Sequence, residues 1–133
     1  MKKDIIQPKV VGVHIAIILE KNELGGEEWI AYVINTRKEK LEGVLVSTRG
    51  YGEIKGEAKK TATFRHSLEE LEPESFKKIE TIPQELFALS NEFWLSFYLD
   101  KKMYDKKYIF LPESISEFNS INIPVIKKMG VMI

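Results

Sequence analysis

Two histidines are the side chains best suited to acid–base or metal chemistry, because the chain has no cysteine. A catalytic imidazole needs a partner that orients its ring, and a zinc site needs further ligands at short spacing. Neither His14 nor His66 has a carboxylate or second histidine at a ligand spacing, although Glu69 and Glu70 lie close enough to His66 for a local pair. The sequence therefore favours structural histidines and predicts no catalytic residue, no metal site and no cofactor.

A glycine-rich segment, residues 49–56 (RGYGEIKG), is the second place where chemistry could occur. Its G-x-G-x-x-x-G spacing matches neither phosphate-binding fingerprint, and its flanks have the composition of strands rather than a helix start. We interpret residues 49–60 as an exposed loop joining two strands. The alternative is a small-molecule or enzyme site at this loop, with these candidate residues: Arg49, Tyr51, Lys55, Arg65 and His66.

Lysine doublets recur along the chain and raise the alternative of an RNA-associated accessory protein. Together with exposed aromatic rings they could form a stripe that binds single strands. However, lysines at strand edges commonly prevent unwanted sheet pairing, and twenty acidic residues balance the twenty basic ones. Nucleic-acid binding is therefore disfavoured but left open. The doublets are Lys59-Lys60, Lys77-Lys78, Lys101-Lys102, Lys106-Lys107 and Lys127-Lys128.

Residues 92–111 predict a β-hairpin around which the other elements can be arranged. Four apolar residues, Phe93, Leu95, Phe97 and Leu99, alternate with Trp94, Ser96, Tyr98 and Asp100. This period of two is typical of a strand with one buried face. Residues 100–103 form a plausible tight turn before a second strand, residues 104–111. Because an isolated hairpin is only marginally stable, a second sheet must cover its apolar face.

The same alternation places Trp94 and Tyr98 on the face opposite the core. Large exposed aromatic side chains are frequent anchors of protein interfaces. Two interpretations stay open: a partner covers these rings, or the C-terminal segment, residues 121–133, folds back over them. Within that segment Ile121, Ile123 and Val125 alternate as further candidate interface residues, and Pro124 favours an edge strand because it lacks an N–H donor.

The other elements also have β composition. Residues 10–20 are apolar on both strand faces, so this strand should lie centrally in its sheet or have its outer face covered. Further strands are expected at residues 27–36, 41–51, 61–68 and 76–82. A short helix is expected at residues 83–90, which begin with proline. The apolar end, residues 130–133, should be tied down or serve as a partner's handle.

This order of strands, with two leucines and Pro73 in a crossover, resembles the fibronectin type III and immunoglobulin-like sandwiches over about residues 9–111. Lys77 stands where fibronectin type III domains would have tyrosine, and the cysteine pair of immunoglobulin domains is absent. The resemblance implies a shape that often serves adhesion or accessory roles, and it implies no chemistry.

Length and composition complete the prediction. A chain of 133 residues, with 44% hydrophobic and 30% charged residues, is expected to form one domain, with core strands in residues 9–111 and residues 112–133 packed on them or extending them. The apolar run 10–19 is about half as long as a membrane helix. We predict an all-β antiparallel sandwich of about seven or eight strands. We expect a non-enzymatic, cytoplasmic module that binds another protein or a second copy of itself, and we expect no association with a membrane.

Overall fold

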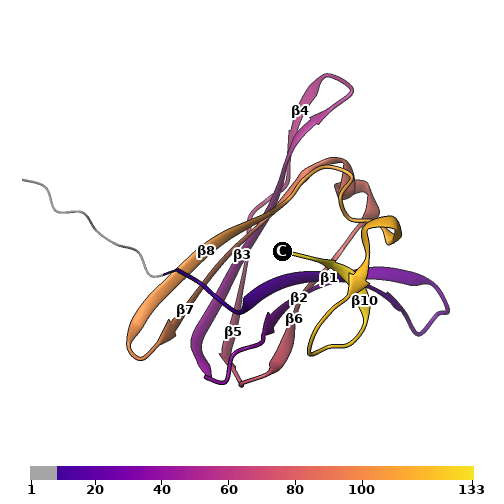
Figure 1. The fold of residues 1–133 in the computed structure, drawn as a ribbon. Helices are drawn as coiled ribbons and strands as arrows, with labels where there is room; N and C mark the ends of the chain where they lie inside the picture. Colours follow the sequence, from indigo (N-terminus) through magenta and orange to yellow (C-terminus); the bar gives the residue numbers. More distant parts are fainter. Residues whose placement is uncertain (1–8) are drawn as a thin grey trace, which may run out of the picture.

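The structure, a computed structural model that describes residues 9–133, consists of two antiparallel sheets packed face to face (Figure 1). The first, called the β1 sheet, has five strands in this order: β6 (Ser75–Ile82), β2 (Glu27–Asn35), β1 (Val13–Lys21), β10 (Met129–Met132) and β9 (Ile121–Asn122). In the second, called the β3 sheet, β4 (Glu57–Lys60) and β5 (Phe64–Leu71) flank the same side of β3 (Leu41–Ile54), followed by β7 (Ser90–Leu99) and β8 (Lys102–Phe110). The predicted all-β sandwich is confirmed.

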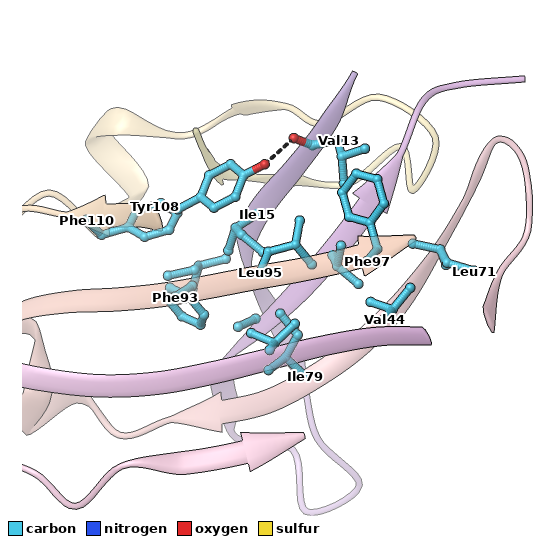
Figure 2. Close-up of a cluster of buried hydrophobic side chains, with 14 of the residues drawn as sticks. Val13, Ile15, Val44, Leu71, Ile79, Phe93, Leu95, Phe97, Tyr108 and Phe110 are labelled. Carbon is cyan, nitrogen blue, oxygen red and sulfur yellow. Dashed lines mark hydrogen bonds between the residues drawn. The ribbon is translucent and has the colours of Figure 1, made fainter. Parts of the chain in front are cut away.

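The core lies between the two sheets and is filled by alternate side chains of each strand. Figure 2 shows Ile15 of β1 facing the apolar side of β7, where Phe93, Leu95 and Phe97 are almost completely buried. Tyr108 of β8 crosses the interior, and its hydroxyl donates a hydrogen bond of 2.6 Å to the Val13 carbonyl (Figure 2). The period-two prediction for β7 is therefore confirmed, since its odd-numbered apolar residues form the core.

The β1 sheet is apolar on both faces because its outer face is covered too. Ile18 and Ile34 are fully buried on that face, away from the main core. The turn between β9 and β10 lies over them and inserts Ile123, which is 0% exposed, and Ile126. The prediction for residues 10–20 is confirmed in both its forms, because β1 lies between β2 and β10 and its outer face is covered.

The predicted edge strand at residues 121–126 is much shorter in the structure. Only Ile121 and Asn122 pair, with β10, and Pro124 then lies in a tight turn. The chain returns as β10, which pairs with β1 and ties down the apolar end as expected. Gly130 permits the close approach of β10 to β1, because a Cβ at this position would lie only 2.5 Å from the Ile17 carbonyl oxygen.

The predicted loop at residues 49–60 is instead a hairpin. β3 continues to Ile54, turns at Lys55 and Gly56 with φ of 53° and 79°, and returns as β4. Two consecutive residues with positive φ fit the tight turns that match the twist of paired strands. The hairpin projects beyond the body of the sandwich (Figure 1). The glycines predict the end of the strand at Tyr51, whereas β3 continues through Gly50 and Gly52 to Ile54.

Three further connections involve helical geometry or positive φ. The predicted helix at 83–90 is a 3₁₀ turn, η1 (Gln84–Ala88), and a second one, η2 (Glu117–Asn119), follows β8. No helix within residues 9–133 combines the length and apolarity that a membrane crossing requires. The β7–β8 turn consists of Asp100 and Lys101 with φ of 51° and 63°. The predicted tight turn at residues 100–103 is confirmed but shorter, because β8 already begins at Lys102.

Candidate protein-interaction surface

Four large apolar side chains are exposed together on the outer face of the β3 sheet. They come from three adjacent strands: Leu45 of β3, Trp94 and Tyr98 of β7, and Met103 of β8. Their exposed fractions are 38%, 45%, 46% and 51%. Tyr98 and Met103 are direct cross-strand partners. We call these four residues the outer aromatic face.

A bulge in β3 lies beside Tyr98. The β3–β7 pairing is irregular between Glu42 and Leu45, and Gly43 there has a φ of 56°. A Cβ on Gly43 would lie 3.4 Å from the Tyr98 ring, which is an ordinary contact distance, so the positive φ rather than the ring favours glycine at this position. The bulge thus shapes the surface as well as the sheet.

A buried carboxylate adjoins the outer aromatic face. Glu92 has outward strand parity but is only 4% exposed. Its Oε2 accepts a hydrogen bond of 3.0 Å from Arg49 Nε, its Oε1 accepts one of 3.1 Å from the Tyr51 hydroxyl, and Lys107 Nζ lies 4.0 Å away. Burial raises the pKa of Glu92, but the bonds from Arg49 and Tyr51 and the two nearby positive charges outweigh it and lower the pKa below its usual value. Glu92 is therefore charged at neutral pH and holds its neighbours in place.

The same cations contact aromatic rings on this face. Lys107 Nζ lies 4.6 Å from the centre of the Trp94 ring, and the Arg49 guanidinium lies 5.2 Å from that of Tyr51. Such cation–π contacts hold the aromatic ring and the cationic group in fixed positions relative to one another. The outer aromatic face is thus bordered by positive charge held by strands rather than by loops.

The predicted ligand-loop residues are only partly brought together. A shallow depression of about 270 Å³ is lined by Ser47, Arg49, Thr63, Arg65, Glu92 and Trp94. Tyr51 lines the adjoining depression, which shares Arg49 and Thr63. Lys55 lies at the far hairpin turn. The structure therefore gathers three of the five residues, Arg49, Tyr51 and Arg65, beside Trp94.

His66, the fifth candidate, contacts Glu80 of β6 instead of the depression. Its Nε2 lies 2.7 Å from Glu80 Oε1, which also accepts a 2.7 Å hydrogen bond from the Thr48 hydroxyl. The expected pairing with Glu69 or Glu70 is wrong, because the corner between β5 and β6 brings Glu80 closer. This cluster joins the two sheets.

His14, the other histidine, is 3.2 Å from the Ile133 carbonyl oxygen. Within residues 9–133, no three potential metal-ligating side chains cluster.

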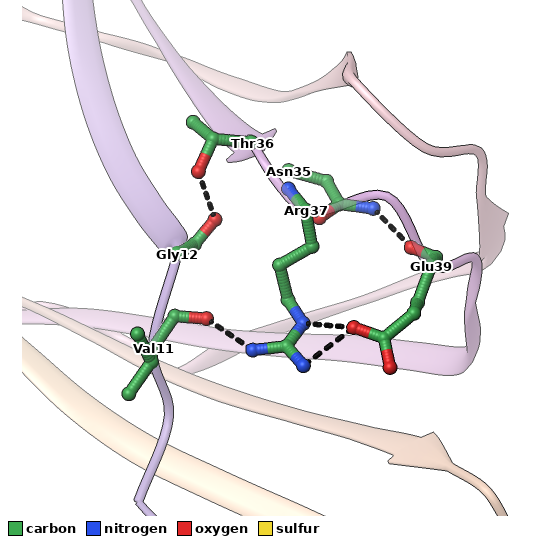
Figure 3. Close-up of polar contacts among 6 residues, drawn as sticks. All are labelled: Val11, Gly12, Asn35, Thr36, Arg37 and Glu39. Atoms are coloured by element: carbon green, nitrogen blue, oxygen red, sulfur yellow. Dashed lines mark hydrogen bonds and ion pairs between the residues drawn. The ribbon is translucent and has the colours of Figure 1, made fainter.

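The polar cluster at the β2–β3 turn is structural as well (Figure 3). Arg37 Nη1 donates a 2.8 Å hydrogen bond to the Val11 carbonyl, and its Nε donates one of 2.9 Å to Glu39. The Thr36 hydroxyl donates to the Gly12 carbonyl over 2.8 Å. These hydrogen bonds fix the start of β1 to the end of β2. The guanidinium of Arg37 thus donates to groups of its own chain.

The candidate interface residues of the C-terminal segment lie away from Trp94 and Tyr98. Ile121 is 50% exposed and lines an apolar groove of about 380 Å³ with Leu111 and Ile133. Ile123 is fully buried over the β1 sheet, and Val125 packs partly buried beside it. The alternative that residues 121–133 cover Trp94 and Tyr98 is wrong, because the segment covers the outer face of the other sheet.

Sequence reasoning missed Leu45, Met103 and Glu92 as parts of this surface. The outward parity of Glu92 beside Trp94 was a usable signal, whereas the exposure of Leu45 depends on the bulge at Gly43. The lysine doublets lie on strands β4, β6 and β8 and at two turns, and these elements belong to both sheets, so the doublets mark no single strand or face.

Comparison with protein-family models, curated proteins and solved structures gives no match to this chain.

Proposed function

We propose that this protein is a non-enzymatic, cytoplasmic protein-interaction module whose binding surface is the outer aromatic face. The observation that carries the proposal is the joint exposure of Trp94, Tyr98, Leu45 and Met103 on paired strands. Contiguous exposed apolar groups are costly in water, and tryptophan and tyrosine dominate the binding energy of many interfaces. The strands hold these rings in place before binding, which lowers the entropy lost on association.

The border of the surface suggests the chemistry of the partner. Arg49 and Lys107 lie beside Tyr51 and Trp94. A partner that places an apolar side chain between the aromatic rings and a carboxylate at this border would fit both features. Charged groups at the rim of an interface contribute more to association rate and specificity than to affinity.

The strand order supports a place among the immunoglobulin-like sandwiches. In the lettering of those domains, strands A, B and E share one sheet and C, F and G share the other. Strands β1, β2 and β6 occupy the first set, and β3, β7 and β8 the second. β5 departs from the constant-type pattern, since it pairs with β3 rather than with β6. Many domains of this shape act as binding modules, which agrees with the proposal.

The proposal is tested by comparing what three forms of the protein retain from a cell extract. We expect Trp94→Ser with Tyr98→Ser to lose a specific protein that the wild type retains at fixed stoichiometry. Phe118→Ser is the matched control, because Phe118 is an aromatic residue 95% exposed on η2, outside the proposed surface. A partner retained equally by all three forms would overturn the proposed surface.

A second candidate function is the binding of a small anion in the depression beside Trp94. Arg65 makes no ion pair within the described part of the chain and faces Ser47 and Thr63. Titration with inorganic sulfate should then shift the NMR signals of Arg65 and of the Trp94 indole, and Arg65→Met should abolish the shifts. Signals that do not respond to sulfate would remove this candidate.

A further inference from the structure

Strand β8 forms an edge of the β3 sheet, and its geometry shows which of its backbone groups are free. It is joined to β7 by a two-residue turn and pairs Leu99 with Lys102. In such a hairpin the closing pair is hydrogen-bonded, and hydrogen-bonded and non-hydrogen-bonded pairs alternate from there. The even-numbered residues 102–110 therefore bond to β7, and the N–H and C=O groups of residues 103, 105, 107 and 109 point away from it. Within residues 9–133, those groups form no other main-chain hydrogen bond.

The side chains at these positions are self-complementary. In order they are Met103, Asp105, Lys107 and Ile109, and all four lie on the outer face of the sheet. If a second copy pairs antiparallel with its axis at residue 106, Met103 faces Ile109 and Asp105 faces Lys107, each twice. A shift by one pair in either direction places Asp105 opposite Asp105 or Lys107 opposite Lys107. Opposite charges across strands stabilise the pair and like charges destabilise it, so one register is selected.

We propose that this protein forms a homodimer by antiparallel pairing of β8 with β8 of a second copy, centred on Lys106. This inference goes beyond the proposed function, because it uses the free edge of β8, and it names both the partner, a second copy of the chain, and the register. The two β3 sheets then form one continuous sheet across the two-fold axis. The main-chain hydrogen bonds supply affinity, and the Asp105–Lys107 pairs supply specificity.

Lys106 is the feature that opposes this pairing, because it meets its own copy at the axis. Inward-pointing lysines are a known defence of sheet edges. Here the Lys106 ammonium lies 4.8 Å from the centre of the Tyr108 ring of its own chain. This contact draws the charge back along β8, so the two ammonium groups need not meet across the axis.

The dimer leaves Leu45, Trp94 and Tyr98 of the outer aromatic face uncovered, because they lie on β3 and β7 rather than on the edge strand. Trp94 lies one strand behind the edge, so the two Trp94 strands are separated by three strand spacings, or about 14 Å. Met103 and Ile109 at the edge gain apolar contacts from the second copy. The result is one broad surface with two identical binding faces, which would bind a divalent partner more tightly than a single face does.

Charge exchange tests the register by sedimentation equilibrium. We expect a wild-type dimer, and a dissociation constant raised at least tenfold by Asp105→Lys or by Lys107→Asp alone, since each places like charges opposite one another. An equimolar mixture of the two variants should form a heterodimer, because lysines then face aspartates on both sides of the axis. The double variant should dimerise again. Thermal melting of each variant checks that its fold is retained.

Amide hydrogen exchange gives an independent readout of the same edge. In a dimer the amides of residues 105 and 107 are protected as well as those of 104, 106 and 108, whereas in a monomer only the even-numbered amides are. Asp105→Pro should abolish dimerisation while leaving the β7 pairing intact, because the lost N–H points away from β7.

Several outcomes would overturn the inference. A wild type that is monomeric at every concentration would do so, and so would a dimer that both single variants retain or that mixing fails to restore. Such failures leave the partner test with Trp94→Ser and Tyr98→Ser unaffected. A partner retained equally by the wild type, by the Trp94→Ser and Tyr98→Ser variant and by Phe118→Ser, with a dimer that persists, would refute the proposed binding surface alone.

Discussion

Replacement of Ile123 by alanine tests how the outer face of the β1 sheet is kept from water. Ile123 is fully buried and packs with Ile18 and Ile34. The change removes three carbon atoms, which at about 0.8 kcal/mol per buried carbon corresponds to about 2.4 kcal/mol. A residual cavity adds to this, and buried isoleucine-to-alanine changes cost about 2–5 kcal/mol. Because the turn that carries Ile123 can move into the cavity more easily than a strand could, we expect a loss of about 3 kcal/mol in the free energy of unfolding.

Ile121→Ala is the matched control, because Ile121 is the same residue type two positions earlier in the same segment but is 50% exposed. We expect it to change the free energy of unfolding by about 0.5 kcal/mol or less. Urea denaturation at pH 7, followed by circular dichroism, measures both values. Equal and small effects of the two changes would refute the packing of residues 123–126 over the β1 sheet.

Three further predictions concern single residues. Gly130→Ala should weaken the β10–β1 pairing, because its Cβ would lie 2.5 Å from the Ile17 carbonyl oxygen; amide exchange in β10 should then become faster, and unchanged exchange would count against this close approach. Tyr108→Phe should lower the free energy of unfolding by about 1–2 kcal/mol in urea denaturation, since it removes the hydrogen bond to the Val13 carbonyl in the interior, and a neutral change would contradict that role. The pKa of Glu92 is lower in the folded protein than its ordinary value, so its contribution to stability is present above about pH 4.5 and is lost as the pH falls through the lowered pKa. Glu92→Gln should therefore reduce the loss of stability between pH 7 and pH 3, and identical pH profiles for variant and wild type would refute the argument.

The sequence predicted the strands where one simple pattern extends over several residues. The alternation from Phe93 to Leu99 specified which side of β7 is buried, and the two apolar faces of residues 10–20 specified a central, covered strand. These predictions succeeded because burial follows directly from side-chain parity. The tight turn predicted at residues 100–103 has a similar local reason, although the structure confines it to Asp100 and Lys101.

The rest depended on contacts between distant segments. Nothing near His66 indicates Glu80, which approaches only because β5 and β6 meet at a corner between the sheets. Likewise, Ile123 and Trp94 are both apolar residues in β-rich segments, and only the path of the C-terminal turn determines that Ile123 is covered while Trp94 is exposed. The extension of β3 to Ile54 and the return as β4 were not predicted, because glycine both ends strands and closes tight turns.

Collisional quenching of tryptophan fluorescence tests the central claim most directly. The chain has two tryptophans, and Trp29 is 4% exposed whereas Trp94 is 45% exposed. We expect iodide to quench only part of the emission, Trp94→Phe to remove that quenchable part, and Trp29→Phe to leave it. Emission from Trp94 that iodide cannot reach would show that its ring is covered, and would contradict an outer aromatic face available for binding.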